Sequence, residues 1–198
     1  MSRQPTVSDG TTPRRSSIAA SAGLGVLAAA VGYLLTYLLI GSDVREAFDG
    51  DVATWKGVAW YFYNAHLVDI EVSGSVGSFG GTDTMNLIAE SSATNAGLLY
   101  VVPPLALLAA GALLARRLHA ADFGEAVAVG APVAIGYAVV MGIGAVVAET
   151  GAEGSFFGIG LSGSMAPELA PAVLLGGILY PLVFAPTGAA LALLFAER

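Results

Sequence analysis

The chain has 198 residues, of which 56% are hydrophobic and 12% charged, a composition that excludes an ordinary soluble globular domain. Fifteen acidic residues outnumber eight basic ones, and the net charge of −7 argues against nucleic acid as a partner, because phosphate binding needs a basic surface. The absence of cysteine excludes disulfides, iron–sulfur clusters and thiol nucleophiles.

The charged residues are biased in kind as well as in number. Lys56 is the single lysine, whereas arginine occurs seven times, and Ala, Gly and Val are abundant. This bias is typical of haloarchaeal proteins, in which concentrated salt screens the repulsion among acidic groups. An acidic membrane protein from any GC-rich organism is the alternative.

The first 17 residues are rich in Ser, Thr, Pro and Arg and have no apolar periodicity. Such a segment cannot bury enough apolar surface to offset the entropy lost on ordering. We therefore expect residues 1–17 to form a disordered cytoplasmic tail, followed by a single transmembrane domain over residues 18–198 that includes an outer loop, residues 41–95.

Four apolar runs of 20 to 25 residues contain no Asp, Glu, Lys, Arg or His, namely residues 18–40, 96–115, 126–148 and 171–195. At about 1.5 Å of rise per residue, a helix of this length crosses the roughly 30 Å hydrocarbon core of a bilayer. A soluble helix would keep a polar stripe, which these runs lack. The sequence predicts an all-α membrane protein, a bundle of four transmembrane helices with a small outer cap that is partly β or interfacial.

Basic residues near the helix ends predict the orientation of this bundle. With the N-terminus inside, six of the eight basic residues fall on the inner side, including Arg116 and Arg117 in a short loop. Arg45 and Lys56 fall outside, where most carboxylates also lie. We expect a multi-pass protein of the cell membrane with both termini in the cytoplasm.

The outer loop contains a cluster of aromatic side chains between residues 52 and 67. Aromatic rings are common at the level of the lipid headgroups, so we expect a short helix lying there, with these interfacial anchors: Trp55, Trp60, Tyr61, Phe62 and Tyr63. Apolar and polar residues then alternate up to Val76, which is the period of a half-buried strand, and the Gly-rich residues 73–82 predict a turn.

The second outer loop, residues 150–170, is unusually apolar around Phe156 and Phe157. It is either a surface loop or a segment that re-enters the bilayer, and the second alternative requires its backbone to be buried in protein. The sequence leaves both open.

Helices in a bilayer associate through close packing of small residues, since lipid tails are as apolar as leucine. The third run carries small residues at four-residue spacing. This predicts a central helix whose packing residues are Gly130, Ala134, Ala138 and Gly142.

Candidate chemistry is sparse. A proton relay needs an ionisable residue inside the membrane, and the four runs offer only tyrosines. Ser162 lies in a Gly-x-Ser-Gly pattern like that of rhomboid proteases, but those enzymes need a later histidine, and His66 and His119 both come earlier. His66, Asp69 and Glu71 form the one local cluster of residues of the types that bind metal ions. An acidic surface exposed to water is the simpler interpretation of this cluster. We expect no catalytic, cofactor or metal site, and hence no enzyme.

The most distinctive segment is Thr54-Trp55-Lys56, followed by the sequence WYFYNAH over residues 60–66, between the first and second apolar runs. With three further apolar runs behind it, this pattern resembles a haloarchaeal family of small membrane proteins classed as a domain of unknown function. The resemblance covers most of the chain beyond the tail. It implies a membrane location and the topology given above, and it assigns no catalytic residue.

Two functions of different classes remain open. The first is a non-enzymatic scaffold or accessory subunit of a membrane complex, whose partners are the lipid bilayer and either a second copy of the chain or another membrane protein. The second is a small-solute channel or transporter, which four spans without internal charge could form only as an oligomer.

Overall fold

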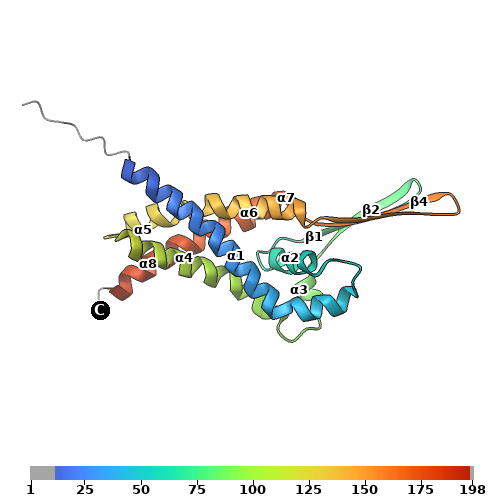
Figure 1. Ribbon diagram of the computed structural model, residues 1–198, viewed down its shortest axis with the longest axis horizontal. Helices are drawn as coiled ribbons and strands as arrows, with labels where there is room; N and C mark the ends of the chain where they lie inside the picture. The colour runs from blue at the N-terminus through green and yellow to red at the C-terminus, as the bar shows by residue number, and fades with distance from the viewer. Residues whose placement is uncertain (1–11, 197–198) are drawn as a thin grey trace, which may run out of the picture.

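The computed structural model describes residues 12–196, a mostly helical chain with a small sheet that projects from one end of a helical bundle (Figure 1). Within these residues, four stretches are long and apolar enough to cross a membrane, and we call them spans 1 to 4: Ser17–Phe48, Ala96–Leu118, Phe123–Val147 and Leu169–Phe195. They correspond to the four apolar runs of the sequence.

The elements follow the chain in a simple order. They are α1 (Thr12–Phe48), α2 (Thr54–Asn64), β1 (Ile70–Val76), β2 (Phe79–Met85), α3 (Leu87–Glu90), η1 (Ala96–Val101), α4 (Val102–Leu118), α5 (Phe123–Gly130), α6 (Val133–Val147), β3 (Thr150–Phe156), β4 (Ile159–Pro167), α7 (Leu169–Pro171), η2 (Ala172–Leu179) and α8 (Tyr180–Ala196).

α1 begins earlier than the apolar run that it contains. Residues 12–17, the last part of the predicted disordered tail, are helical. Pro13 is tolerated there because the N–H groups of a first helical turn have no partner within the helix. The remainder of the predicted tail lies outside the described residues.

The spans pack in a ring, in the order span 1, span 3, span 4 and span 2, with span 2 returning to span 1. Reciprocal glycines make the closest crossings. A Cβ atom on either Gly25 or Gly136 would overlap a carbonyl oxygen across the contact between α1 and α6, and the same holds for Gly111 and Gly188 between α4 and α8. Small residues therefore set the separation of both pairs of helices.

The turn between spans 2 and 3 is fixed by local capping. α4 ends with His119 in the left-handed conformation, at φ 54°, after two arginines that complement the helix dipole. α5 then begins with a reciprocal cap similar to a capping box: the Asp122 carboxylate accepts from the Glu125 N–H at 2.9 Å, and the Glu125 carboxylate accepts at 2.8 Å from the N–H of Ala121, the residue before the N-cap.

Span 4 changes its winding along its length. After the short α7, residues 172–179 form a π-helix (η2), and the α-helical α8 begins next to Pro181, which has no N–H to donate. Such segments are rare and frequently mark functional positions. Here Gly176 leaves room for the side chain of Met141, with His66 next to it, and Gly177 leaves room for the backbone of Ala138.

Two hairpins form one antiparallel sheet in the order β2-β1-β4-β3. β1 and β4 are the central pair, from Ile70 opposite Pro167 to Val76 opposite Leu161. Each hairpin closes with a two-residue turn that has positive φ, at Gly77 in one and at residues 157–158 in the other, which suits the twist of the strands. Both turns lie at the end of the sheet far from the bundle (Figure 1).

The sheet settles the two loop predictions. The alternation up to Val76 is a strand, as expected, but the predicted turn over residues 73–82 is reduced to residues 77 and 78. The second outer loop is the hairpin of β3 and β4 and is mostly exposed, so it does not re-enter the bundle. Its backbone groups pair with β1 and with each other, and therefore need no burial against helices.

The glycine crossing between α1 and α6 predicts a stability effect. Gly136→Ala should destabilise the protein by about 1 to 3 kcal/mol, the usual cost of overpacking, and so lower its Tm in detergent micelles. Gly23→Ala in α1 is the matched control, because a Cβ there meets no atom within 4 Å. Equal Tm values for the two variants would contradict the close crossing.

Candidate functional site

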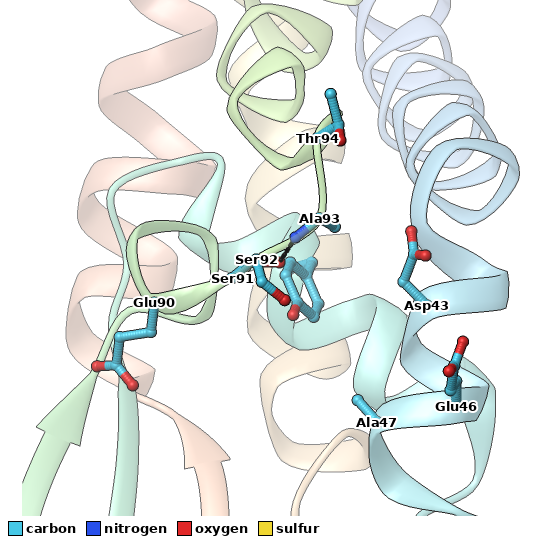
Figure 2. Close-up of a pocket in the computed structure, with 9 residues that line it drawn as sticks. Asp43, Glu46, Ala47, Glu90, Ser91, Ser92, Ala93 and Thr94 are labelled. Atoms are coloured by element: carbon cyan, nitrogen blue, oxygen red, sulfur yellow. Dashed lines mark hydrogen bonds between the residues drawn. The ribbon is translucent and has the colours of Figure 1, made fainter.

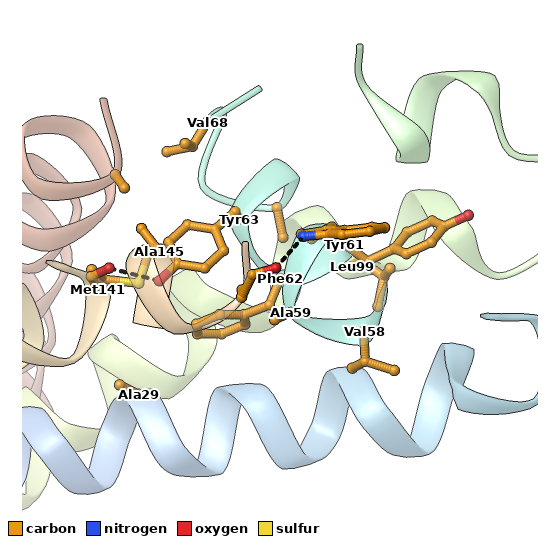
Figure 3. Close-up of a cluster of buried hydrophobic side chains, with 14 of the residues drawn as sticks. Ala29, Val58, Ala59, Tyr61, Phe62, Tyr63, Val68, Leu99, Met141 and Ala145 are labelled. Carbon is orange, nitrogen blue, oxygen red and sulfur yellow. Dashed lines mark hydrogen bonds between the residues drawn. The ribbon is translucent and has the colours of Figure 1, made fainter. Parts of the chain in front are cut away.

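α2 is the most deeply buried part of the outer loop. It packs against α1 at the end of the bundle that carries the sheet, with Phe62 and Tyr63 pointing toward α1 and α6 (Figure 3). Trp60, Tyr61, Phe62 and Tyr63 are only 0 to 7% exposed, whereas Trp55 is 43% exposed.

This burial corrects the predicted helix at headgroup level. Of the five predicted anchors, only Trp55 is placed where lipid could reach it, and protein surrounds the other four rings. The physical reason is that α2 is apolar around its whole circumference over residues 57–63, so it has no polar stripe to turn toward water.

Three side chains on one face of α2 bind carbonyl oxygens of α6 and of the two residues that follow it. The Lys56 ammonium donates to the Glu149 carbonyl, the Trp60 indole N–H donates to Ala148 at 3.0 Å, and the Tyr63 hydroxyl donates to Met141 at 2.6 Å. Residues 56, 60 and 63 share a helix face because they are four and three positions apart. The first two bonds satisfy carbonyls that a helix C-terminus leaves without a partner.

Gly144 makes the Tyr63 bond possible, since a Cβ at that position would lie 2.6 Å from the Tyr63 hydroxyl oxygen.

His66, just after α2, makes a further contact with α6, deeper in the bundle. Its Nδ1 lies 2.7 Å from the Phe62 carbonyl oxygen and its Nε2 lies 2.7 Å from the Tyr137 hydroxyl. Tyr180 of span 4 donates to the Ala65 carbonyl at 3.4 Å. Tyr137 is ten residues from the end of α6 at Val147, on the order of 15 Å along the helix. The end of α2 is thus held between spans 3 and 4.

The hydrogen bonds of His66 determine its proton position. A carbonyl oxygen only accepts, so Nδ1 carries the hydrogen, and Nε2 of the neutral ring then accepts from the Tyr137 hydroxyl. Burial lowers the pKa of His66 from its usual 6.5 to about 4, more than the Phe62 carbonyl raises it. At neutral pH this histidine is an uncharged structural link and does not carry a mobile proton.

Asn64 and Asn86 join the rest of the outer loop to this core. Asn64 donates to the Val68 carbonyl at 2.9 Å and accepts from the Leu87 N–H at 2.8 Å. Asn86 caps α3 and accepts from the Tyr100 hydroxyl of η1 at 3.2 Å. Every buried side-chain polar atom among the described residues has a hydrogen-bond partner. Residues 54–100 are therefore a cross-linked unit and not a loose loop.

Two hollows flank this unit. An open, acidic hollow of about 580 Å³ is lined by Asp43 and Glu46 of α1 and Glu90 of α3 (Figure 2). An apolar groove of about 290 Å³ lies beside α2, with Tyr33, Trp55 and other apolar side chains in its walls, and suits a hydrocarbon chain better than a polar solute.

The described part of the chain holds no group of three or more His, Asp or Glu side chains arranged for a metal ion.

The predicted packing stripe of the third run faces span 4. A Cβ on Gly130 would lie 2.8 Å from Pro186, the Cα of Ala138 lies 2.7 Å from the Cβ position of Gly177, and a Cβ on Gly142 would meet Val173 at 3.4 Å. Ala134, between them, is buried. A second face of span 3, through Gly136 and Gly144, takes α1 and α2, so span 3 has neighbours on two sides.

The serine of the protease-like pattern has no catalytic surroundings. Ser162 lies on the exposed part of β4, where its hydroxyl pairs with that of Ser75 at 2.7 Å, while His66 is bound to Tyr137 inside the bundle.

Within residues 17–195, the buried polar side chains are Ser21, Thr36, Asn64 and His66, and no carboxylate, ammonium or guanidinium group is buried with them.

The sequence interpretation missed the docking of α2 and the role of His66. The available signal was the uninterrupted apolar run over residues 57–63, which is too short to span a bilayer and yet has no polar face. Which carbonyls and hydroxyls it would meet depends on residues 71 to 93 positions away, and no local pattern carries that information.

Comparison with known proteins adds one result. The family described as "Family of unknown function (DUF7978)" matches residues 1–196. The chain belongs to this family. No curated protein and no solved structure matches the chain. Membership in DUF7978 agrees with the expected domain of unknown function and assigns no activity to α2 or to the sheet.

The contact between His66 and Tyr137 predicts a specific loss of stability. Tyr137→Phe removes the donor to Nε2 and leaves a buried acceptor unpaired, which should cost about 1 to 3 kcal/mol and lower Tm. Tyr37→Phe is the control, because the Tyr37 hydroxyl makes no hydrogen bond within residues 12–196. The double variant His66→Phe/Tyr137→Phe should regain part of the loss. Identical Tm values for the two single variants would refute the bond.

Proposed function

We propose that this chain is a non-enzymatic, multi-pass membrane protein that holds a rigid β-sheet on the outer side of the membrane as a docking element for other proteins of that membrane. The observation that carries the proposal is the combination of a fully hydrogen-bonded core around α2 with a projecting sheet whose far end exposes large apolar side chains. Such surfaces on folded proteins mark interaction sites.

A membrane location is supported by the four apolar spans. Side chains such as Leu38, which is 81% exposed, and Ile143, which is 62% exposed, lie on the outside of the bundle, where lipid accommodates them and water does not. The bias of arginines toward the end with Arg116 and Arg117 supports a cytoplasmic location for that end and an outer location for the sheet. The excess of acidic residues and the single lysine favour a haloarchaeal cell.

A docking role is better supported than a transport role. Transport paths through membrane proteins use ionisable side chains or hydrated cavities in the interior. In the described part of this chain the buried polar side chains are few, and each is hydrogen-bonded to a neighbouring residue. The hollow with Asp43 and Glu46 is open to solvent at the end of α1.

Single cysteines test the orientation, since the chain has none of its own. We expect Ser78→Cys, at the exposed turn between β1 and β2, to react with a membrane-impermeant maleimide in intact cells. Ala121→Cys, at the exposed turn between spans 2 and 3, should react only after the cells are broken. The reverse pattern would overturn the topology, and labelling of both in intact cells would overturn the four-span arrangement.

Reconstituted vesicles separate docking from transport. Purified protein in lipid vesicles should release small ions and neutral solutes at the same rate as protein-free vesicles, because the buried polar side chains of the described residues are few and already hydrogen-bonded. Vesicles containing a known pore former show that the assay detects flux. Release above the protein-free rate that scales with the amount of protein would replace the docking proposal with the channel.

A further inference from the structure

We propose that the groove between α4 and α8 binds one membrane lipid with an anionic phosphate headgroup, whose hydrocarbon chain lies in the groove while Arg116 binds the phosphate. This inference rests on the proposed function in one respect, the location of the bundle in a membrane. It goes beyond that function because it assigns a ligand class and a binding site to the end of the bundle far from the sheet.

The groove is an apolar hollow of about 330 Å³ between two neighbouring helices (Figure 1). Every side chain that lines it is apolar except that of Arg116. Its walls are open to the outside of the bundle, since Leu105 is 58% exposed and Phe195 is 66% exposed. Four small residues line it and leave the space that a hydrocarbon chain would occupy, namely Ala109, Ala112, Gly188 and Ala192.

A second hollow, of about 260 Å³, adjoins the groove near the end of span 2. Arg116 and Ala192 line both hollows, and His119 lines the second one. No carboxylate of the described residues lines either hollow. An apolar space and a space with basic side chains are therefore joined at the guanidinium of Arg116.

The guanidinium of Arg116 has no anionic partner among residues 12–196, where it makes no ion pair and no hydrogen bond. The nearby carboxylates of Asp122 and Glu125 instead accept from backbone N–H groups at the start of α5. The planar fork of a guanidinium matches two oxygens of a phosphate group. Arg116 is thus available to bind a phosphate at the end of the groove.

The length of the groove agrees with one leaflet of a bilayer. Leu105 and Arg116 line its two ends and are eleven positions apart on α4, which is about 17 Å along a helix. One leaflet contributes about 15 Å, half of the roughly 30 Å hydrocarbon core. Arg116 lies two residues before the end of span 2 at Leu118, where a span reaches the headgroups. A lipid whose phosphate binds Arg116 therefore has its chain beside Leu105.

An anionic lipid matches both parts of this site in a single molecule. An apolar helix of another protein would fill the groove and leave Arg116 without an anion, and inorganic phosphate would leave the groove empty. Basic pockets between transmembrane helices on the cytoplasmic side bind anionic lipid headgroups. The excess of arginines at this end of the bundle supports that side for Arg116.

Lipid binding to the purified protein in neutral detergent micelles, measured by native mass spectrometry, tests the headgroup contact. We expect one bound dioleoylphosphatidylglycerol, with a Kd about tenfold below that of dioleoylphosphatidylcholine, because the charge-assisted bond is not offset by a choline cation. Arg116→Gln should raise the Kd of the anionic lipid about tenfold. Arg117→Gln is the matched control, since it removes the same charge one residue away and lines neither hollow. Its Kd should stay within about twofold of the unmodified protein.

A second pair of variants tests the chain contact. Ala109→Phe places a ring in the groove at an exposed position of α4, so the core needs no rearrangement. It should raise the Kd of the anionic lipid about tenfold with Arg116 intact, because it displaces the chain from apolar surface. Leu113→Phe, at a 44% exposed position outside the groove, should leave the Kd unchanged. Millimolar inorganic phosphate should not displace the lipid.

Each contrary result overturns a defined part of the inference. Equal Kd values for the two lipids, or equal losses in Arg116→Gln and Arg117→Gln, would overturn phosphate binding by Arg116. Unchanged binding in Ala109→Phe would overturn the groove as the site of the chain, and displacement by inorganic phosphate would overturn the lipid as ligand. A dimer that Ala109→Phe dissociates would assign the groove to a second copy.

The proposed function is tested separately. Binding in micelles depends neither on the orientation of the bundle nor on the sheet, so failure of the lipid site leaves the docking role intact. A reversed cysteine-labelling pattern or solute release from vesicles would overturn the proposed function and leave the measured lipid affinity as it is.

Discussion

The hydrogen bonds between α2 and α6 are the constraint on which the rest of the structure depends. A short helix inside a bundle is stable only if its own polar groups and those of its neighbours are satisfied without water. Lys56, Trp60 and Tyr63 meet this condition by binding carbonyls of α6 and its C-terminal extension, and His66 extends the contact to Tyr137. The apolar circumference of α2 supplies burial energy, and these bonds fix its position.

Fixing α2 also fixes the sheet. β1 begins four residues after His66, and the Glu168 N–H donates to the Asp69 carbonyl at 3.1 Å, so the strands leave the bundle from a rigid base. β4 continues directly into span 4. Both hairpins are therefore attached to spans and to α2, and the exposed apolar side chains at the far end of the sheet are held in a defined orientation. A surface held in this way is what the proposed docking role requires.

The sequence predicted the elements whose signals are local. Four long apolar runs became four helices, and the alternation ending at Val76 became β1. It failed for Trp60 to Tyr63, which were interpreted as interfacial because aromatic rings next to a membrane usually are. It also left residues 150–170 undecided, because β4 joins the sheet by pairing with β1, more than 80 residues earlier, and because Gly-rich strands show weak periodicity.

Composition and hydrophobic run length alone determined that this chain has four helices suited to a bilayer, since a helix of given length and apolarity has few other stable environments. Only the tertiary structure decided which side chains those helices surround and which face of the sheet stays uncovered. The reason is that burial and hydrogen bonding of His66, and the register that gathers Phe79, Phe156 and Leu161, arise from contacts between segments distant in sequence.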